Sequence, residues 1–205
     1  MVDHGPVGDI ETPRLTLRVL LPAVDAALSG DVAEASRRLA AAIPDDLFRD
    51  PQVLKLARSR LAADGAYGPW SPRAMILRDG TTMIGHIGFH TAPDPEYLRP
   101  FARGAVEVGY TVFEGWRRRG YAREALGAIM AWATREHGVR NFVASVSPDN
   151  VASLAVIRGF RFAKVGAHID EEDGPEDIFL RRLAPLDRPP PSDAVESRGG
   201  ASDGT

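Results

Sequence analysis

The residues best suited to chemistry lie in the stretch 107–122, where a predicted strand, a basic turn and a predicted helix follow one another. The turn holds three consecutive arginines, Arg117, Arg118 and Arg119, followed directly by Gly120. The first N–H groups of a helix have no partner inside the helix, and glycine lets an anion approach the backbone closely. Arginine adds charge-assisted hydrogen bonds to phosphate. This pattern predicts a polyphosphate-binding turn at the start of a helix.

Hydrophobic periodicity indicates the elements that position this turn. Residues 105–112 alternate with the period of a strand, so that Glu107, Gly109 and Thr111 share one face. No Walker-type G-x-x-x-x-G-K-S/T motif and no dinucleotide-binding G-x-G-x-x-G motif accompanies the turn, which argues against both kinds of phosphate loop. Beyond the turn, apolar residues recur with the spacing of an amphipathic helix at Ala122, Ala125, Leu126, Ile129 and Ala133.

A second informative stretch covers residues 141–165. It is predicted to contain a strand at 141–146, a short helix that ends near Ile157, and a returning strand that begins at Phe160. Asn150 is placed to cap the helix, and Ser153 lies in its first turn. Both residues therefore have a structural interpretation as well as a functional one.

Three motifs together resemble the GNAT superfamily of N-acetyltransferases. The first is Glu-Val-Gly-Tyr followed by Arg-x-x-Gly-x-Ala, with Arg117, Gly120 and Ala122 at the fixed positions. The second is Asn-x-x-Ser, a short apolar helix and Gly-Phe at 150–160. The third, Glu-Thr-Pro-Arg-Leu-x-Leu-Arg at 11–18, is similar to the first strand of the branch that acetylates the N-termini of ribosomal proteins. The resemblance runs from 12 to about 183, most of the chain.

This resemblance implies an α/β (α+β) fold in which helices flank a mixed, mostly antiparallel, splayed sheet of about seven strands. We expect a single N-acetyltransferase domain at residues 10–185. A flexible arm at 1–9 and a disordered tail at 186–205 are expected outside it, since neither segment has hydrophobic periodicity and the tail is rich in Pro, Ser and Gly.

The resemblance also implies acetyl-CoA as the cosubstrate. The pantetheine amides would pair with the strand backbone around 110–112, and the pyrophosphate would bind the N–H groups at the start of the helix. The implied acetyl-CoA contacts are Tyr110, Thr111, Val112, Arg117, Arg118, Arg119, Gly120, Tyr121, Ala122, Asn150 and Ser153.

Acyl transfer to an amine requires that the nitrogen lose its proton. Glu107 is the candidate base, acting directly or through water, although a strand carboxylate can also be a plain surface residue. In the ribosomal-protein branch, the position of Ser153 implies that it protonates the departing thiolate, and the Val112 amide is the expected oxyanion donor. The chain departs from many relatives in lacking a tyrosine in the helix after Asn150. Ser153 is therefore the favoured candidate for protonating the thiolate.

The composition of the chain argues against several kinds of partner and site. The chain has 205 residues, of which 44% are hydrophobic and 26% charged, with a net charge of −3 and no cysteine. No nucleic-acid partner is therefore expected, and disulfides and Cys-containing metal sites are excluded. His86 and His90 would lie roughly 13 Å apart on one strand, too far to share an ion, so no metal is expected. The N-terminus lacks the pattern of a signal peptide and no apolar run could span a membrane, which predicts a cytoplasmic protein.

The resemblance implies that the acceptor is a primary amine, either a protein N-terminus or a small molecule. Its identity would be set by the stretches 43–72 and 92–104, which contain no motif that names a substrate. Two other functions are compatible with the sequence: an acyl-CoA sensor without turnover, and a phosphate- or nucleic-acid-binding module that uses the three arginines. The sequence is compatible with a homodimer.

Overall fold

The computed structural model describes residues 7–49, 51–78, 80–170 and 174–184. The strands are β1 (Ile10–Glu11), β2 (Leu15–Val19), β3 (Arg73–Leu77), β4 (Met83–Phe89), β5 (Ala105–Val112), β6 (Asn141–Val146), β7 (Ala163–Asp170) and β8 (Gly174–Arg182). The helices are α1 (Leu21–Leu28), α2 (Val32–Leu39), α3 (Asp46–Arg49), α4 (Gln52–Ala63), α5 (Tyr121–His137) and α6 (Val151–Gly159), and short 3-10 turns lie at η1 (Gly65–Trp70), η2 (Glu96–Leu98) and η3 (Glu114–Trp116).

Within the described residues, eight strands form one sheet in the order β1-β2-β3-β4-β5-β6-β8-β7. Only the β5–β6 pair is parallel, so the mixed, mostly antiparallel sheet is confirmed. The count exceeds the expected seven or so, and β1 is a strand that the prediction did not separate from β2. The returning strand β7 begins at Ala163, later than expected, because α6 continues to Gly159 and the chain then turns at Arg161 with a positive φ.

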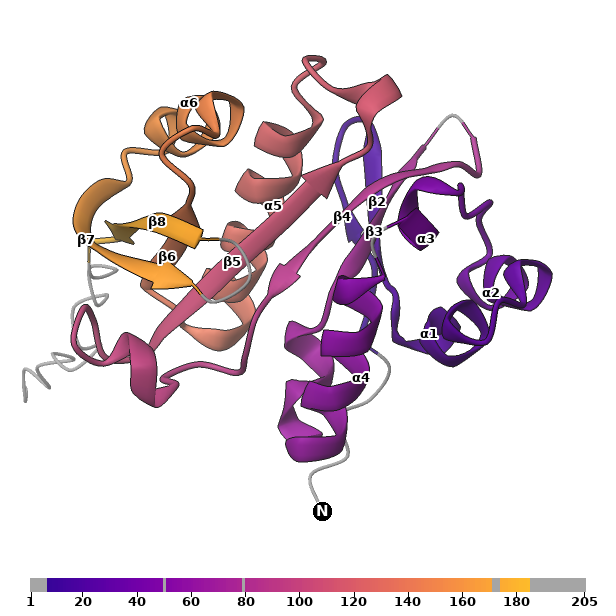
Figure 1. The fold of residues 1–205 in the computed structure, drawn as a ribbon, viewed down its shortest axis with the longest axis horizontal. Coiled ribbons are helices and arrows are strands. Elements are labelled where there is room, and N and C mark those ends of the chain that lie inside the picture. Colours follow the sequence, from indigo (N-terminus) through magenta and orange to yellow (C-terminus); the bar gives the residue numbers. More distant parts are fainter. Residues whose placement is uncertain (1–6, 50, 79, 171–173, 185–205) are drawn as a thin grey trace, which may run out of the picture.

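Two hydrophobic layers cover opposite faces of the sheet. Helix α5 packs Leu126 and Ile129 against one face, where Val106 and Val108 of β5 are buried. Helices α1, α2, α3 and α4 cover the other face, in contact with Ala74, Ile76 and Met83. Figure 1 shows α5 behind β5, with α1, α2 and α3 gathered on the right. Because side chains alternate along a strand, the odd-numbered side chains of β5 point away from α5.

The sheet separates into two parts after Glu107. Strands β5 and β6 pair over Ala105–Glu107 and 141–143, after which β6 continues to pair with β8 as far as Val146. In Figure 1, β6, β7 and β8 turn away from β5 on the left. The splayed sheet expected from the sequence is therefore present, and it opens along the second half of β5.

Several predicted segments lie outside the described residues. They are 1–6 of the expected arm and 185–205 with the expected tail. Asp79, from an Asp-Gly pair whose composition favours a hairpin turn, and 171–173, from the acidic run 171–177 whose composition favours a turn, also lie outside them. The described end of the arm is held in place: Gly8 O accepts a hydrogen bond from the fully buried Arg73 (2.9 Å), and Asp9 pairs with Arg18 (2.8 Å).

Candidate active site

The turn before α5 has the geometry of an anion site. Gly120 is the N-cap residue and takes a left-handed conformation with φ +82°. The first α-helical hydrogen bond runs from Glu124 N to Gly120 O (3.1 Å), so the N–H groups of the first turn point out of the helix end. A left-handed φ favours glycine, because a side chain there is strained. The backbone can therefore present the expected phosphate-binding surface.

The three arginines of this turn have different surroundings. Arg117 Nε donates to Val112 O (2.9 Å), which ties the turn back to the end of β5. The Arg119 guanidinium lies 5.2 Å from the centre of the Trp116 ring, and Arg118 is exposed with φ +60°. Two of the three arginine side chains thus contact the turn itself.

Arg14, which no sequence motif marked as a site residue, holds this turn from its position just before β2. Its guanidinium donates to Arg119 O (2.9 Å), contacts the carboxylate of Glu124 (2.6 Å) and lies 4.5 Å from the Tyr121 ring centre. Burial raises the pKa of Glu124, but hydrogen bonds from Thr12 and Arg14 lower it below its ordinary value. Arg14 therefore offsets a carboxylate that would otherwise repel an anion at the helix start.

The ladder between β4 and β5 determines which backbone groups of β5 face the opening. His90 N donates to Glu107 O, and Phe113 N donates to Ile84 O, both at 2.9 Å. Antiparallel pairs alternate, so the odd-numbered residues from 107 to 113 direct their backbone groups to β4. The even-numbered residues direct theirs to the side where β6 diverges.

This alternation distinguishes the three residues expected to contact pantetheine. The N–H groups of Tyr110 and Val112 point toward the opening, as an added strand or an oxyanion would require. The Val112 carbonyl is already bonded to Arg117. The backbone of Thr111 faces β4, so contact with a ligand would have to come from its exposed side chain.

Glu107 is buried, with 6% of its surface exposed, and not a plain surface carboxylate. Oε1 accepts a hydrogen bond from Ser145 Oγ (2.5 Å), Oε2 accepts one from Tyr97 Oη (2.8 Å), and His90 Nδ1 lies 3.4 Å from Oε2. Burial raises the pKa of Glu107, but interactions with His90, Ser145 and Tyr97 outweigh burial and lower it to about 2. The carboxylate is thus held ionised and is a weak proton acceptor near neutral pH.

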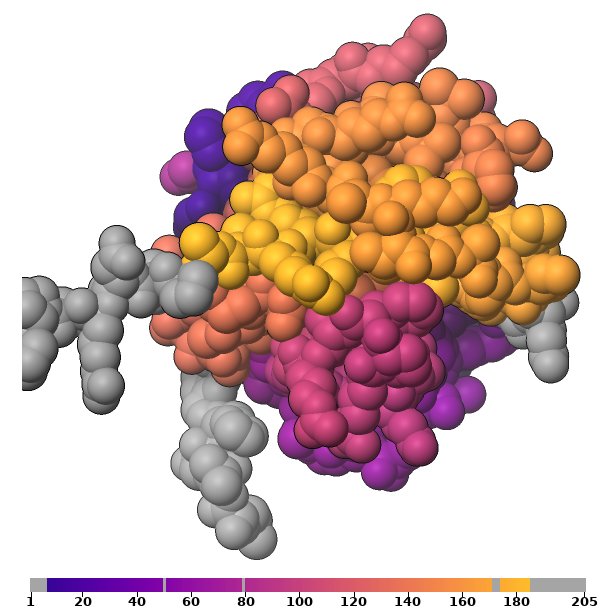
Figure 2. Space-filling view, turned by 90° about the vertical axis from the view of Figure 1, so that its left-hand side faces the viewer, coloured from indigo at the N-terminus to yellow at the C-terminus, as the bar shows by residue number. Residues whose placement is uncertain are grey.

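The three partners of Glu107 come from separate elements. His90 follows β4, Ser145 lies on β6, and Tyr97 lies on η2. Figure 2 shows the loop that contains η2 in magenta, against β7 and β8. Burial and the charge of Glu107 both raise the pKa of Tyr97. In the sequence, His90 stands out only as a possible metal ligand, whereas period-two alternation combined with the β4–β5 register places it beside Glu107.

The second predicted catalytic residue, Ser153, lies on α6 and contacts β5. Its Oγ donates to Tyr110 Oη (2.9 Å), and its N–H donates to Asn150 Oδ1 (3.0 Å). Asn150 is therefore the helix cap, as its position suggested. Burial raises the pKa of Tyr110, and the bond from Ser153 lowers it in part. The strand thus supplies a phenol beside Ser153, where the helix itself has no tyrosine.

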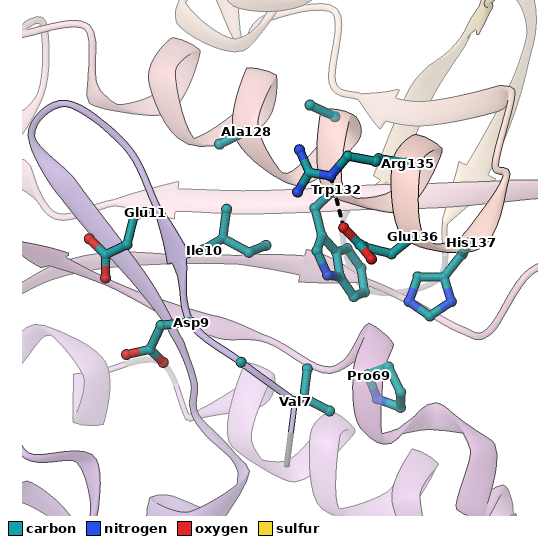
Figure 3. A pocket seen from close by; sticks show the side chains of 12 residues that line it. Val7, Asp9, Ile10, Glu11, Pro69, Ala128, Trp132, Arg135, Glu136 and His137 are labelled. Carbon is teal, nitrogen blue, oxygen red and sulfur yellow. Dashed lines mark hydrogen bonds and ion pairs between the residues drawn. The ribbon is translucent and has the colours of Figure 1, made fainter. Parts of the chain in front are cut away.

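The aromatic segment at η1 covers the core. Tyr67 and Trp70 are both buried; Tyr67 Oη donates to Phe89 O (3.0 Å), and the Trp70 ring centre lies 5.5 Å from those of Phe89 and Trp132. A cavity of about 740 Å³ lies nearby, between residues 7–11 and the C-terminal half of α5 (Figure 3). The predicted site residues are not among the described residues that line it.

No described helix is both long and apolar enough to cross a bilayer. Among the same residues, His, Asp and Glu side chains form no group of three that could hold a metal ion.

A sheet that splays beside a strand with outward N–H groups, next to the N-terminus of a long helix, defines an acyltransferase class of fold. The chain belongs to the GNAT acetyltransferase family, because the model of the acetyltransferase (GNAT) domain matches residues 14–163.

Several acetyltransferases are similar to this chain in sequence or in fold. YnaD of Bacillus subtilis, an uncharacterized N-acetyltransferase, is 28% identical over 92 residues, 45% of this chain, and the match spans only about half (49%) of YnaD. L-2,4-diaminobutyric acid acetyltransferase of Streptomyces coelicolor is 28% identical over 155 residues, covering 68% of this chain and 84% of that protein. RimL, a ribosomal L7/L12 alpha-N-protein acetyltransferase in complex with coenzyme A, has the same fold at 20% identity, with a TM-score of 0.58 over 86% of this chain and 98% of RimL.

Proposed function

We propose that this protein transfers the acetyl group of acetyl-CoA directly to a primary amine. The observation that carries the proposal is the arrangement around β5. Its even-numbered N–H groups face the opening in the sheet, and the turn that follows presents the N–H groups of α5 beside it. Acetyl-CoA carries a thioester at one end and a pyrophosphate further along, so the thioester arm can lie along β5 while the pyrophosphate reaches the start of α5.

The described residues fit the coenzyme. Gly120 carries no side chain at the helix start, and a Cβ there would approach Arg14 Nη2 to 3.4 Å. The first-turn N–H groups of α5, including those of Tyr121 and Ala122, would hold the pyrophosphate, and the N–H groups of Tyr110 and Val112 would hold the pantetheine. Arg118 can add a contact to the coenzyme, and Asn150 can add another through its side-chain amide. Acetyl-CoA supplies an activated acetyl group.

The groups around the opening meet the needs of acyl transfer. The Val112 N–H can stabilise the oxyanion, because it points toward the opening. The Ser153–Tyr110 hydroxyl pair can donate a hydrogen bond to the departing thiolate. An α-amine has a pKa of about 7.7–8.0, so a neighbouring group must remove its proton at neutral pH. Glu107 contributes to the removal of this proton indirectly, through the side chains that it contacts.

Two kinds of acceptor have support among the relatives. Similarity to a diaminobutyric acid acetyltransferase favours a small amine, and a shared fold with RimL is compatible with a protein N-terminus. A primary amine is the chemistry that both share.

Release of free thiol from acetyl-CoA tests the proposal. The acceptors would be L-2,4-diaminobutyrate and short peptides with a free α-amine, and an N-acetylated copy of each peptide is the matched control. We expect thiol release with at least one free amine and none above background with its acetylated copy. Thermal stabilisation by CoA without turnover on any amine would instead indicate a sensor. No stabilisation by CoA would contradict the coenzyme site itself.

A further inference from the structure

His90 lies beside Glu107 on the sheet face that points away from α5. Its backbone N–H donates to Glu107 O (2.9 Å), and its Nδ1 lies 3.4 Å from Glu107 Oε2. The two side chains differ sharply in exposure, 42% for His90 and 8% for Glu107. The imidazole is therefore the member of the pair that a ligand on this face can reach.

Gly109 fixes the other side of the imidazole. A Cβ built on Gly109 would lie 2.6 Å from His90 Nε2, closer than real Cβ atoms come to such an atom. The ring therefore lies across β5 in space that only a glycine leaves open. With Nδ1 at the carboxylate and Nε2 over Gly109, the ring is positioned from both ends.

The carboxylate is less suited to take a proton from an amine. Both of its oxygens have partners, Oε1 with Ser145 and Oε2 with Tyr97 and His90. Its pKa of about 2 is far below neutrality, because burial is outweighed by those contacts. An ionised carboxylate that accepts from Nδ1–H leaves the lone pair on Nε2, the atom that can accept a proton.

We propose that His90 takes the proton from the acceptor amine at Nε2, and that Glu107 acts as a positioning residue that holds the imidazole through Nδ1. This inference rests on the proposed acetyl transfer. In the step, the amine nitrogen bonds to the acetyl carbonyl carbon, the C–S bond breaks, and the N–H proton passes to Nε2. The coenzyme leaves as a thiolate. The imidazolium then returns its proton to solvent and the thiolate is protonated, so that the products are the N-acetyl amine and the CoA thiol.

Other titratable groups face the same cluster. Tyr97 approaches Glu107 from η2, His86 lies on the same face of β4, and Arg60 of α4 acts electrostatically on Tyr97. Their charges contribute to the pH dependence of any rate, so the variants are compared at one pH.

His90→Gln is the first test, and His168→Gln is its matched control. His168 is 41% exposed and lies 3.6 Å from a carboxylate oxygen of Glu176, so it reproduces the pair on an outer strand. We expect His90→Gln to lower kcat/KM for the amine about 10²–10⁴-fold while thermal stabilisation by CoA is kept. His168→Gln should change neither quantity.

Double variants separate positioning from direct base chemistry. If Glu107 acts through His90, Glu107→Gln lowers the rate of the wild-type protein but changes the His90→Gln variant by no more than about threefold. Gly109→Ala, which displaces the ring, should behave in the same way. A further large loss on adding Glu107→Gln to His90→Gln would instead make Glu107 the base and overturn the inference.

The outcomes also separate this inference from the proposed function. Wild-type turnover that His90→Gln leaves within about threefold overturns the role of His90 alone. A wild-type protein that CoA stabilises, but that acetylates none of the amines, overturns both. Loss of CoA stabilisation in His90→Gln would show that the residue supports the coenzyme site, and it would overturn the assignment as proton acceptor.

Discussion

The burial of Glu107 predicts a specific loss of stability in acid. Its pKa falls from an ordinary 4.5 to about 2 in the folded protein, because contacts with His90, Ser145 and Tyr97 outweigh burial. A carboxyl group whose folded pKa lies below its unfolded pKa stabilises the folded state above the unfolded value. This contribution is lost as the pH falls from about 4.5 toward 2.

The size of the loss follows from the difference between the two pKa values. It is about 2.5 pH units, and each unit corresponds to about 1.36 kcal/mol, so the ionised carboxylate contributes about 3 kcal/mol at neutral pH. This is a large share of the roughly 5–15 kcal/mol that stabilises an ordinary domain.

Urea unfolding of the wild-type protein and Glu107→Gln, measured in steps from pH 7 to pH 2.5, tests this value. The difference in unfolding free energy between the two proteins isolates Glu107 from the other carboxylates. It should shrink by about 3 kcal/mol as the pH falls to 2.5. Ser145→Ala removes one of the hydrogen-bond donors to Glu107 and should retain only part of this dependence. A difference that stays constant below pH 5 would refute the conclusion that the fold holds this carboxylate ionised.

Three further variants test the coenzyme site. Gly120→Glu should abolish thermal stabilisation by CoA, because it strains a left-handed residue and adds a negative charge at the helix start; full stabilisation would mean that the phosphate site is misplaced. Arg14→Ala should weaken CoA binding about tenfold in a thermal-shift titration, whereas the exposed Arg118→Ala should weaken it less; equal effects would contradict the role of Arg14 as the residue that holds the turn. Ser153→Ala and Tyr110→Phe should each lower kcat about 10- to 100-fold with CoA binding retained, and an unchanged kcat in both would exclude the hydroxyl pair.

Elements with a clear period were predictable from the sequence. The strand at Ala105–Val112, the strand at Asn141–Val146 and the helix after Gly120, which is α5 (Tyr121–His137), agree with the structure. Each depends on local information, either alternation or an apolar stripe. The bounds of β7 were less predictable, because the strand is exposed along most of its length and so has little hydrophobic alternation.

The site was predictable only where it depends on local backbone geometry. Gly120 could be selected, since a glycine at a strand-to-helix turn has a local meaning. The contact between Arg14 and Glu124 spans 110 residues and depends on how β2 packs beside α5. The surroundings of Glu107 were hidden for the same reason, because its partners come from three separate elements that only the register brings together.

In the proposed mechanism, the alternation of β5 places the two proton transfers on opposite faces of one strand. On one face of β5, Glu107 and Gly109 lie beside His90, the proposed proton acceptor. On the opposite face, the Tyr110 hydroxyl lies beside Ser153. Between them, the N–H of Val112 points sideways into the opening. A shift of the β4–β5 register by one residue would exchange the two faces, so this register determines the active site as well as the fold. Under the proposed mechanism, the amine would therefore lose its proton on one side of the thioester while the sulfur gains one on the other, and the two groups would not compete for the same space.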